Sequence, residues 1–180
     1  MKPFTMSRLV LLVCVGAALT AFAGWSLKAE PEVGFTATGT VGLKFDGKAS
    51  KMTVKDDGKA TVITVQIKDL DTGIGLRNRH MSEDLESEKY PEIALAIPDE
   101  ALKVLADGKS AEGDGKGNFT LHGKTKEISF KYKTVCKAAV CDVDATGAIN
   151  LKDYDVKVRS YLGVTVKPDV SIHAKFTLAQ

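Results

Sequence analysis

The chain has 180 residues, 44% of them hydrophobic and 27% charged, with 25 Lys and Arg against 23 Asp and Glu. This length is enough for one domain with a substantial core. Because the charges nearly balance and are scattered singly, the composition favours neither nucleic acid nor an anionic membrane surface as an electrostatic partner.

The first segment, residues 1–23, has the features of a secretory signal peptide. A basic start precedes an apolar run at 9–19 and a cleavage site of the A-x-A type, which together are typical of an exported chain. The run is shorter than the about 20 apolar residues that span a bilayer. We therefore expect cleavage after Ala23 and a periplasmic or secreted protein. Cleavage removes Lys2 and Arg8 and no acidic residue, so the mature chain is formally neutral.

Apolar and polar residues alternate with period two through most of the remaining chain, which predicts strands with one apolar face. Residues 24–32 form a short leader, and residues 33–45 predict the first strand of a single domain that spans 33–180. Turn signals such as Asp46-Gly47 and the glycine-rich stretch 113–117 predict hairpins between about eight antiparallel strands. The other clear alternating runs lie at residues 63–67, 93–97, 119–121, 128–136, 141–149 and 170–178.

Helix is scarce, with one or two short helices expected. Residues 99–106 begin with acidic side chains and precede Gly108, and residues 77–89 fit a second helix that ends at Tyr90-Pro91. Two short helices cannot cover a sheet, and the apolar faces of the strands must therefore cover one another. They can do so in a barrel or in a sandwich, and the period of the sequence does not distinguish these two folds. Small inward residues favour a barrel with room for one slim ligand, although glycines at barrel corners explain them nearly as well.

Two cysteines, Cys136 and Cys141, remain after cleavage. Folding the chain at residues 137–140 places both thiols on one side of a hairpin, close enough to bond. A disulfide is the default in an oxidising compartment. Because no further zinc ligands occur at suitable spacing, we expect the disulfide and no metal site.

The stretch 71–81, DTGIGLRNRHM, raises the question of a catalytic site. Its first three residues form the triplet of aspartic proteases, but those enzymes need two aspartates that share a proton, and the chain has one copy. A strand that ends in a turn explains the triplet. No other catalytic pair or cofactor motif occurs, so we expect a protein that is not an enzyme and needs no cofactor.

Three longer stretches resemble the YceI-like family of exported bacterial proteins. They are LDTGIGLRNRHMSEDLESEKYPEIAL, GNFTLHGKTKEISFKY and VRSYLGVTVKPDVSIHAKFTL, and the resemblance runs from about Phe35 to Leu178. It implies an all-β fold, a single antiparallel lipocalin-like barrel, whose interior holds an isoprenoid or other long-chain amphiphile in the periplasm or outside the cell. The sequence departs from the family at Asn78, where an Asp is common.

We therefore expect an exported binding protein that holds a long-chain lipid for transport or storage, with transient membrane contact and no nucleic-acid partner. Burial of the lipid tail supplies the free energy. The alternative is a structural or stress-related partner-binding barrel with a filled core. The sequence does not indicate the oligomeric state. The predicted apolar lining consists of Phe35, Val41, Leu43, Ile63, Val65, Ile67, Leu95, Phe119, Leu121, Phe130, Tyr132, Ile172 and Phe176.

Arg77 and His80 are the candidates for contact with a lipid head group at the barrel mouth. Arginine suits bidentate contact with phosphate. The competing interpretation is that these side chains only tie the loop down, by bonding backbone carbonyls and a carboxylate such as Asp84. We favour that interpretation for Arg79.

Overall fold

A computed structural model describes residues 26–56, 59–102, 109–161 and 163–179 of the chain. The predicted signal peptide, residues 1–23, lies outside the described residues. The elements in chain order are β1 Ser26–Leu27, β2 Glu32–Gly39, the 3-10 helix η1 Thr40–Gly42, β3 Lys44–Ala49, β4 Thr53–Asp56, β5 Ala60–Gln66, η2 Ile67–Asp69, α1 Gly75–Asp84, β6 Glu92–Pro98, η3 Asp99–Leu102, β7 Ala111–Leu121, β8 Lys124–Lys137, β9 Val140–Asn150, η4 Leu151–Tyr154, β10 Ser160–Tyr161 and β11 Val164–Ala179.

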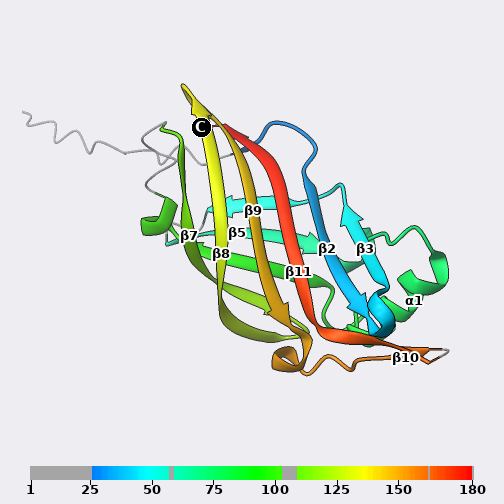
Figure 1. Cartoon of the computed structure of the whole chain (residues 1–180). Helices are drawn as coiled ribbons and strands as arrows, with labels where there is room; N and C mark the ends of the chain where they lie inside the picture. The colour runs from blue at the N-terminus through cyan, green and yellow to red at the C-terminus, as the bar shows by residue number, and fades with distance from the viewer. Residues whose placement is uncertain (1–25, 57–58, 103–108, 162, 180) are drawn as a thin grey trace, which may run out of the picture.

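All the described strands belong to one antiparallel sheet that curls into an open barrel (Figure 1). Its main path runs β3-β2-β11-β9-β8-β7-β6-β5-β4, and the short β1 and β10 pair with β11. The strands β3 and β4 are the two ends of this path. Near that seam, Lys48 and Asp71 form an isolated bridge, with N···O distances of 2.9 and 2.8 Å. The predicted all-β, lipocalin-like fold is confirmed.

Alternation explains why the sheet curls around an apolar interior. In β9 the inward positions run Cys141, Val143, Ala145, Gly147 and Ile149, while the intervening positions are exposed or polar. The paired strands β8 and β11 have matching inward phases, so their apolar side chains meet on one face. With one described α-helix, no helical layer covers that face, and the sheet must cover itself.

One predicted strand and two predicted turns are wrong. The run 33–45 is not one strand, because η1 interrupts it at Gly42, which has a φ of 80°, a conformation that favours glycine. Asp46-Gly47 lies inside β3 rather than in a turn, because Gly47 pairs with Phe35 across the sheet. The stretch 113–117 likewise belongs to β7 and pairs with β8.

The helical predictions are partly right. The predicted helix 77–89 appears as α1, which begins two residues earlier and ends at Asp84. The predicted helix 99–106 is a 3-10 turn over 99–102, and residues 103–106 lie outside the described part of the chain. Within the described ranges, no helix has the length and apolar character needed to cross a membrane.

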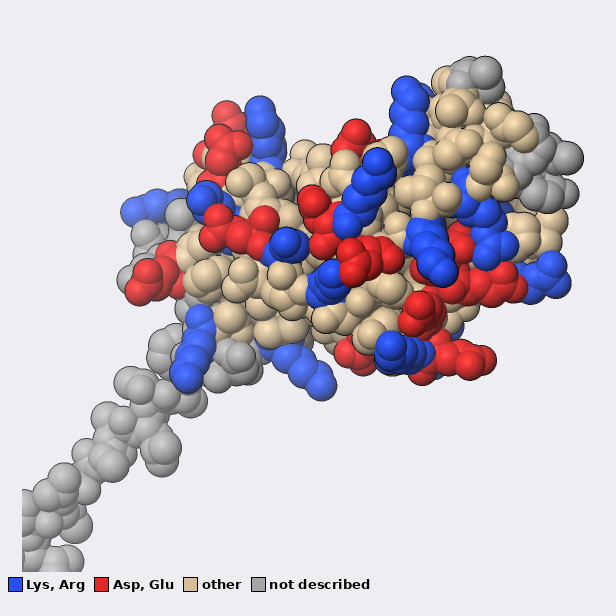
Figure 2. Space-filling model, turned by 90° about the horizontal axis from the view of Figure 1, so that it is seen from below, with Lys and Arg blue, Asp and Glu red and all other residues tan. Residues whose placement is uncertain are grey.

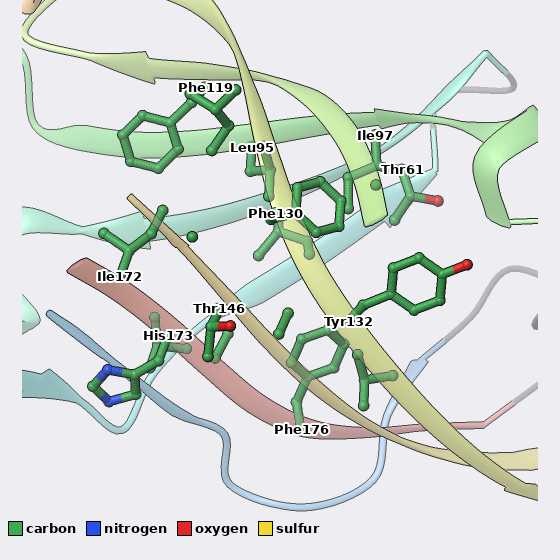
Figure 3. Close-up of a pocket in the computed structure, with 18 of the residues that line it drawn as sticks. Thr61, Leu95, Ile97, Phe119, Phe130, Tyr132, Thr146, Ile172, His173 and Phe176 are labelled. Atoms are coloured by element: carbon green, nitrogen blue, oxygen red, sulfur yellow. The ribbon is translucent and has the colours of Figure 1, made fainter. Parts of the chain in front are cut away.

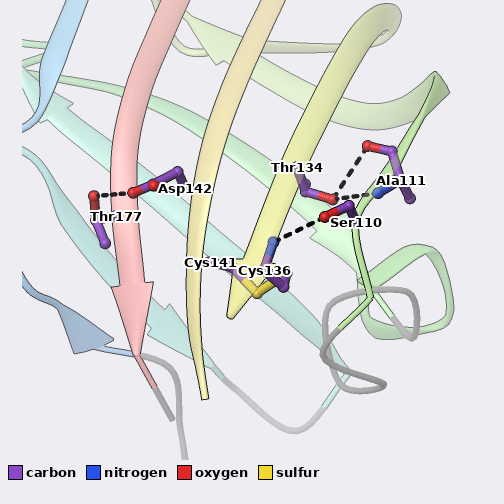
Figure 4. Close-up of a disulfide and its surroundings, with 7 residues drawn as sticks. All are labelled: Ser110, Ala111, Thr134, Cys136, Cys141, Asp142 and Thr177. Atoms are coloured by element: carbon purple, nitrogen blue, oxygen red, sulfur yellow. Dashed lines mark hydrogen bonds between the residues drawn. A yellow bond between two sulfur atoms is a disulfide. The ribbon is translucent and has the colours of Figure 1, made fainter. Parts of the chain in front are cut away.

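The predicted disulfide is confirmed. Cys136 and Cys141 are directly opposed in the β8–β9 hairpin and bonded to each other (Figure 4). Cys141 is fully buried in a cluster that includes Phe176 and Leu178. The Ser110 Oγ accepts a hydrogen bond from the Cys136 N–H at 3.3 Å. This bond links β8 to the residue that precedes β7.

Candidate functional site

Two cavities lie inside the curl of the sheet. The larger, the sheet cavity, has a volume of about 660 Å³ and is lined mainly by β4 to β9 and β11. The smaller, the helix cavity, has a volume of about 480 Å³ and lies against α1, Leu43 and residues 156–159. Both are in the size range of small-molecule sites. The side chains that line both cavities, and so form the wall between them, are Phe35, Leu70, Ile93, Phe119 and Ile172.

The sheet cavity stays open because large inward side chains face glycines across the strands. The Phe35 ring lies over Gly47 and the Phe130 ring over Gly115, so closely that a Cβ at either glycine would overlap the ring. The rings therefore cover backbone instead of filling the lumen. At Gly147, which lines the sheet cavity, a Cβ would instead make ordinary van der Waals contacts of 3.4 Å with Ile172 and Phe130.

The lining of the sheet cavity is mostly apolar (Figure 3). Leu95, Phe119, Phe130 and Phe176 are among the side chains that surround it in the close-up. The hydroxyl of Thr134, which also lines this cavity, already has hydrogen-bond partners. Its Oγ1 donates to the Ala111 carbonyl and accepts from the Ala111 N–H, both at 3.2 Å. Such a cavity suits an apolar chain.

The N-terminal end of α1 is fixed by a compact hydrogen-bond cluster. The Asp71 Oδ1 accepts from the Gly73 N–H and from the Asn78 Nδ2, both at 2.8 Å. The Asn78 Oδ1 accepts from the Thr72 N–H at 2.8 Å and from its hydroxyl at 2.6 Å. The bond from Asn78, followed by that from Gly73, lowers the pKa of Asp71. The DTG triplet thus forms a turn, and Asn78 serves it by donating and accepting at once, which a carboxylate there would not do.

The C-terminal end of α1 is fixed by an arginine from a distant part of the chain. The Arg159 Nη2 and Nε lie 2.7 and 3.0 Å from the Asp84 Oδ1, and Nη2 lies 3.2 Å from the Glu83 Oε2. Asp84, followed by Glu83, raises the pKa of Arg159. Sequence reasoning assigned Asp84 to Arg77 or His80 and missed Arg159, because a contact across 75 positions leaves no local signal.

The turn between β7 and β8 is fixed by contacts with η4 and with Tyr90. The His122 Nδ1 donates to the Tyr154 carbonyl at 2.9 Å, and the His122 ring packs edge-on against Tyr90 at 5.0 Å between centroids. Lys124 forms an ion pair with Asp155 and lowers its pKa. Residues 121–125 therefore connect this turn to η4 and to Tyr90, just before β6. This role is structural.

The basic residues of the stretch 71–81 have different surroundings. Arg77 lies with its guanidinium carbon 5.0 Å from the centre of the Phe45 ring and donates one long hydrogen bond, 3.5 Å, to the Thr72 carbonyl. Arg77 and His80 both line the helix cavity. Arg79 is 68% exposed and lies 3.7 Å from Glu83, as an i,i+4 surface pair. Of these three residues, Arg77 and His80 line a cavity and Arg79 does not.

The predicted lining residues divide among several places. Leu43 departs most from the expectation, because the break at η1 moves it to the rim of the helix cavity, where it is 48% exposed. Ile67 lies in η2, 1% exposed, and borders neither cavity. The side chain of Val41 lies outside what the structure describes, and Leu121 lines the helix cavity. The sheet cavity is lined by the others: Phe35, Ile63, Val65, Leu95, Phe119, Phe130, Tyr132, Ile172 and Phe176.

Several lining residues were missed by the sequence reasoning. Ile74, Leu76 and Met81 line the helix cavity but follow no period-two pattern, since they belong to α1 and its entry. Leu70 lies in the wall between the cavities, in the loop after η2. Among the described residues, no three His, Cys, Asp or Glu side chains are grouped so as to hold a metal ion.

Comparison with known proteins identifies a family and a fold. The family profile described as a YceI-like domain matches residues 25–178. A UPF0312 protein of Pseudomonas putida strain W619 is 24% identical over 160 residues, which cover 84% of this chain and 79% of the relative. A second, from strain GB-1, is 23% identical with the same coverage.

Solved structures share the fold at low sequence identity. A polyisoprenoid binding domain from Saccharophagus degradans, implicated in plant cell wall breakdown, superposes with a TM-score of 0.71 at 17% identity, over 86% of this chain and 97% of its own. BcnA of Burkholderia cenocepacia superposes with a TM-score of 0.63 at 15% identity, over 82% and 95%. At these identities the likeness establishes the fold alone.

Proposed function

The chain belongs to the YceI-like family, and from this premise we propose that it is an exported protein that binds an isoprenoid-like or other long-chain amphiphile for transport or storage. The observation that carries the proposal is the pair of apolar cavities separated by one wall of side chains. A hydrocarbon chain gains roughly 0.8 kcal/mol for each methylene removed from water, and such cavities supply that gain. The name of the Saccharophagus degradans neighbour, a polyisoprenoid binding domain, supports this ligand class.

The head group of the bound lipid is proposed to lie in the helix cavity. Arg77 lines this cavity and forms no ion pair with any carboxylate in the described part of the chain. Its guanidinium is held by Phe45 and the Thr72 carbonyl, which leaves donors for a phosphate or carbonyl oxygen. His80 lines the same cavity. The tail would then reach the sheet cavity by displacing side chains of the shared wall.

Binding without catalysis fits this site better than an enzyme does. The carboxylates beside the helix cavity, Asp71 and Asp84, are occupied by structural hydrogen bonds. The open cavities also weigh against the alternative of a partner-binding barrel with a filled core.

Export is part of the proposal and rests on residues 1–23. The Cys136–Cys141 disulfide supports it, because disulfides persist mainly in oxidising compartments. Sequencing the N-terminus of protein recovered from the periplasm or medium should give a chain that begins at Gly24. An uncleaved chain that remains in the cytoplasm would refute export.

The binding proposal is tested by filling the cavity at one position. In Gly147→Leu the new side chain points into the sheet cavity, whereas in the matched control Ala148→Leu it points outward from the same strand. Native mass spectrometry and organic extraction should find lipid with the wild type and the control. Gly147→Leu should bind an added isoprenoid at least about tenfold more weakly, as expected for losing a few buried methylenes. Equal binding by both variants, or none by the wild type, would contradict the proposal.

A further inference from the structure

The rim of the helix cavity exposes an unusual set of apolar side chains. Leu43, Ile74 and Leu76 are 48%, 50% and 45% exposed, and all three line the mouth of this one cavity. The other large apolar side chains exposed in the described part of the chain, Val135 and Val140, lie in the disulfide hairpin and line neither cavity. Clustered exposure around a cavity marks an interaction surface more often than single exposed residues do.

These rim residues are held in place. Ile74 and Leu76 follow the turn at Asp71, whose hydrogen bonds fix the start of α1. Leu43 is positioned by the break between β2 and β3, where its carbonyl accepts a hydrogen bond from the Gly39 N–H at 2.7 Å. The apolar rim is therefore formed by two separate segments of chain that are both anchored.

The charges around the rim favour an anionic partner. Lys44 adjoins Leu43, and Arg77 and Lys157 line the helix cavity. None of these three forms an ion pair with a carboxylate that the structure describes, whereas Glu83 and Asp84 are neutralised by arginines. In the space-filling view, the right-hand end, where α1 and β10 lie in Figure 1, has an uncharged area with basic and acidic side chains along its border (Figure 2).

We propose that this rim is a docking surface for a bilayer that contains anionic phospholipid. Apolar side chains flanked by cations suit the membrane interface, where the former enter the acyl region and the latter meet phosphates. A bilayer also explains why the patch surrounds a cavity mouth, since an apolar ligand then passes between the two without crossing water. The inference rests on the proposed lipid-binding function and names where the lipid enters and leaves.

The apolar part of the rim is tested with a pair of double variants. Ile74→Ser with Leu76→Ser removes two rim side chains, and Val135→Ser with Val140→Ser removes two somewhat less exposed ones elsewhere as the control. The readout is sedimentation with vesicles of phosphatidylcholine and phosphatidylglycerol. The rim variant should partition at least about tenfold more weakly, and the control should match the wild type. Equal loss in both variants, or in neither, would overturn the docking surface.

The charged part is tested on the same vesicles. Lys44→Gln with Lys157→Gln should weaken partitioning and reduce its salt dependence, whereas Lys131→Gln with Lys133→Gln, on the outer face of β8, should do neither. Wild-type protein that binds pure phosphatidylcholine as well as the mixed vesicles would overturn the anionic preference.

The docking surface and the proposed function fail in different ways. Isoprenoid delivered from a water-miscible solvent measures cavity binding without a membrane. Lys44→Gln, at a residue that lines neither cavity, should retain this binding while taking up less lipid from vesicles. Wild-type protein that takes up no lipid but partitions through the rim would refute the carrier function and support the docking surface. Wild-type protein that takes up lipid normally but does not partition to vesicles would support the carrier function and refute the docking surface.

Discussion

The two cavities are built by different means. The sheet cavity is enclosed by neighbouring hairpins, whose inward residues follow one alternating pattern in β7, β8 and β9. The helix cavity is closed by α1, which is attached at both ends by specific polar contacts, through Asp71 at one end and Arg159 at the other. Packing therefore holds the first cavity together, and individual pairs hold the second. The wall of the sheet cavity should matter most to folding, and the mouth of the helix cavity should matter most to exchange with the surroundings.

The largest expected effect is the loss of stability on changing the lining of the sheet cavity. Phe176→Ala removes a ring that is 9% exposed and should lower the free energy of unfolding by about 3 kcal/mol. Leu76→Ala at the rim, where the side chain is 45% exposed, should change it by less than about 0.5 kcal/mol. Urea denaturation measures both. An equal loss of unfolding free energy in both variants would mean that Leu76 belongs to the core as much as Phe176 does.

The next effect concerns the disulfide end of the sheet cavity. Replacing both Cys136 and Cys141 by Ala should cost about 2 kcal/mol, a value at the low end because the bond closes a short loop. Wild-type protein treated with a reductant should approach the same stability. Unchanged unfolding in both cases would show that the hairpin is held by its strand pairing alone.

A smaller and more local effect is expected at α1. Arg159→Ala should speed amide hydrogen exchange throughout α1 while exchange in β8 and β9 stays the same, because the ion pair fixes the helix and not the sheet. Arg79→Ala is the control, since its pair with Glu83 is exposed and lies within the helix itself. Faster exchange in the strands as well would mean that α1 and the sheet open together.

The smallest effect is a dependence on acid at the other end of α1. The pKa of Asp71 is lowered in the folded protein, so its stabilising contribution is present above the ordinary carboxyl pKa and is lost as pH falls through the folded value. In an acid titration followed by NMR, the α1 signals should broaden or shift below about pH 4. Asp71→Asn should remove that pH dependence. The same titration in the variant as in the wild type would exclude Asp71 as its source.

The sequence predicted the sheet cavity better than the helix cavity for a physical reason. Period two reports which face of a strand is apolar, so positions such as Phe130 and Ile172 could be placed inward from the sequence alone. It does not report a left-handed residue such as Gly42, and so the chain reversal at η1 was missed and Leu43 was placed inside. Glycines in the sheet were also misread, because Gly115 accommodates a ring rather than forming a turn.

The helix cavity depends on pairs that no local pattern contains. Arg159 meets α1 only because β9, η4 and the segment after it return the chain to the barrel mouth. The grouping of charges in the fold also has no local signal in the sequence. Along the sequence Arg77 and Lys157 are far apart, and the balanced composition argued against an anionic partner, whereas the fold brings these two cations to one cavity, whose lining also includes Leu43, the neighbour of Lys44.

The bridge between Lys48 and Asp71 links β3, at the end of the sheet, to the turn that precedes α1. The ends of the sheet, β3 and β4, are joined in the chain by residues 50–52, and across the seam the bridge supplies two backbone hydrogen bonds rather than a ladder. Asp71 belongs both to the bridge, through its backbone, and to the attachment of α1, through its carboxylate. Opening of the seam and displacement of the start of α1 would therefore both break contacts of Asp71, the first through its backbone and the second through its carboxylate.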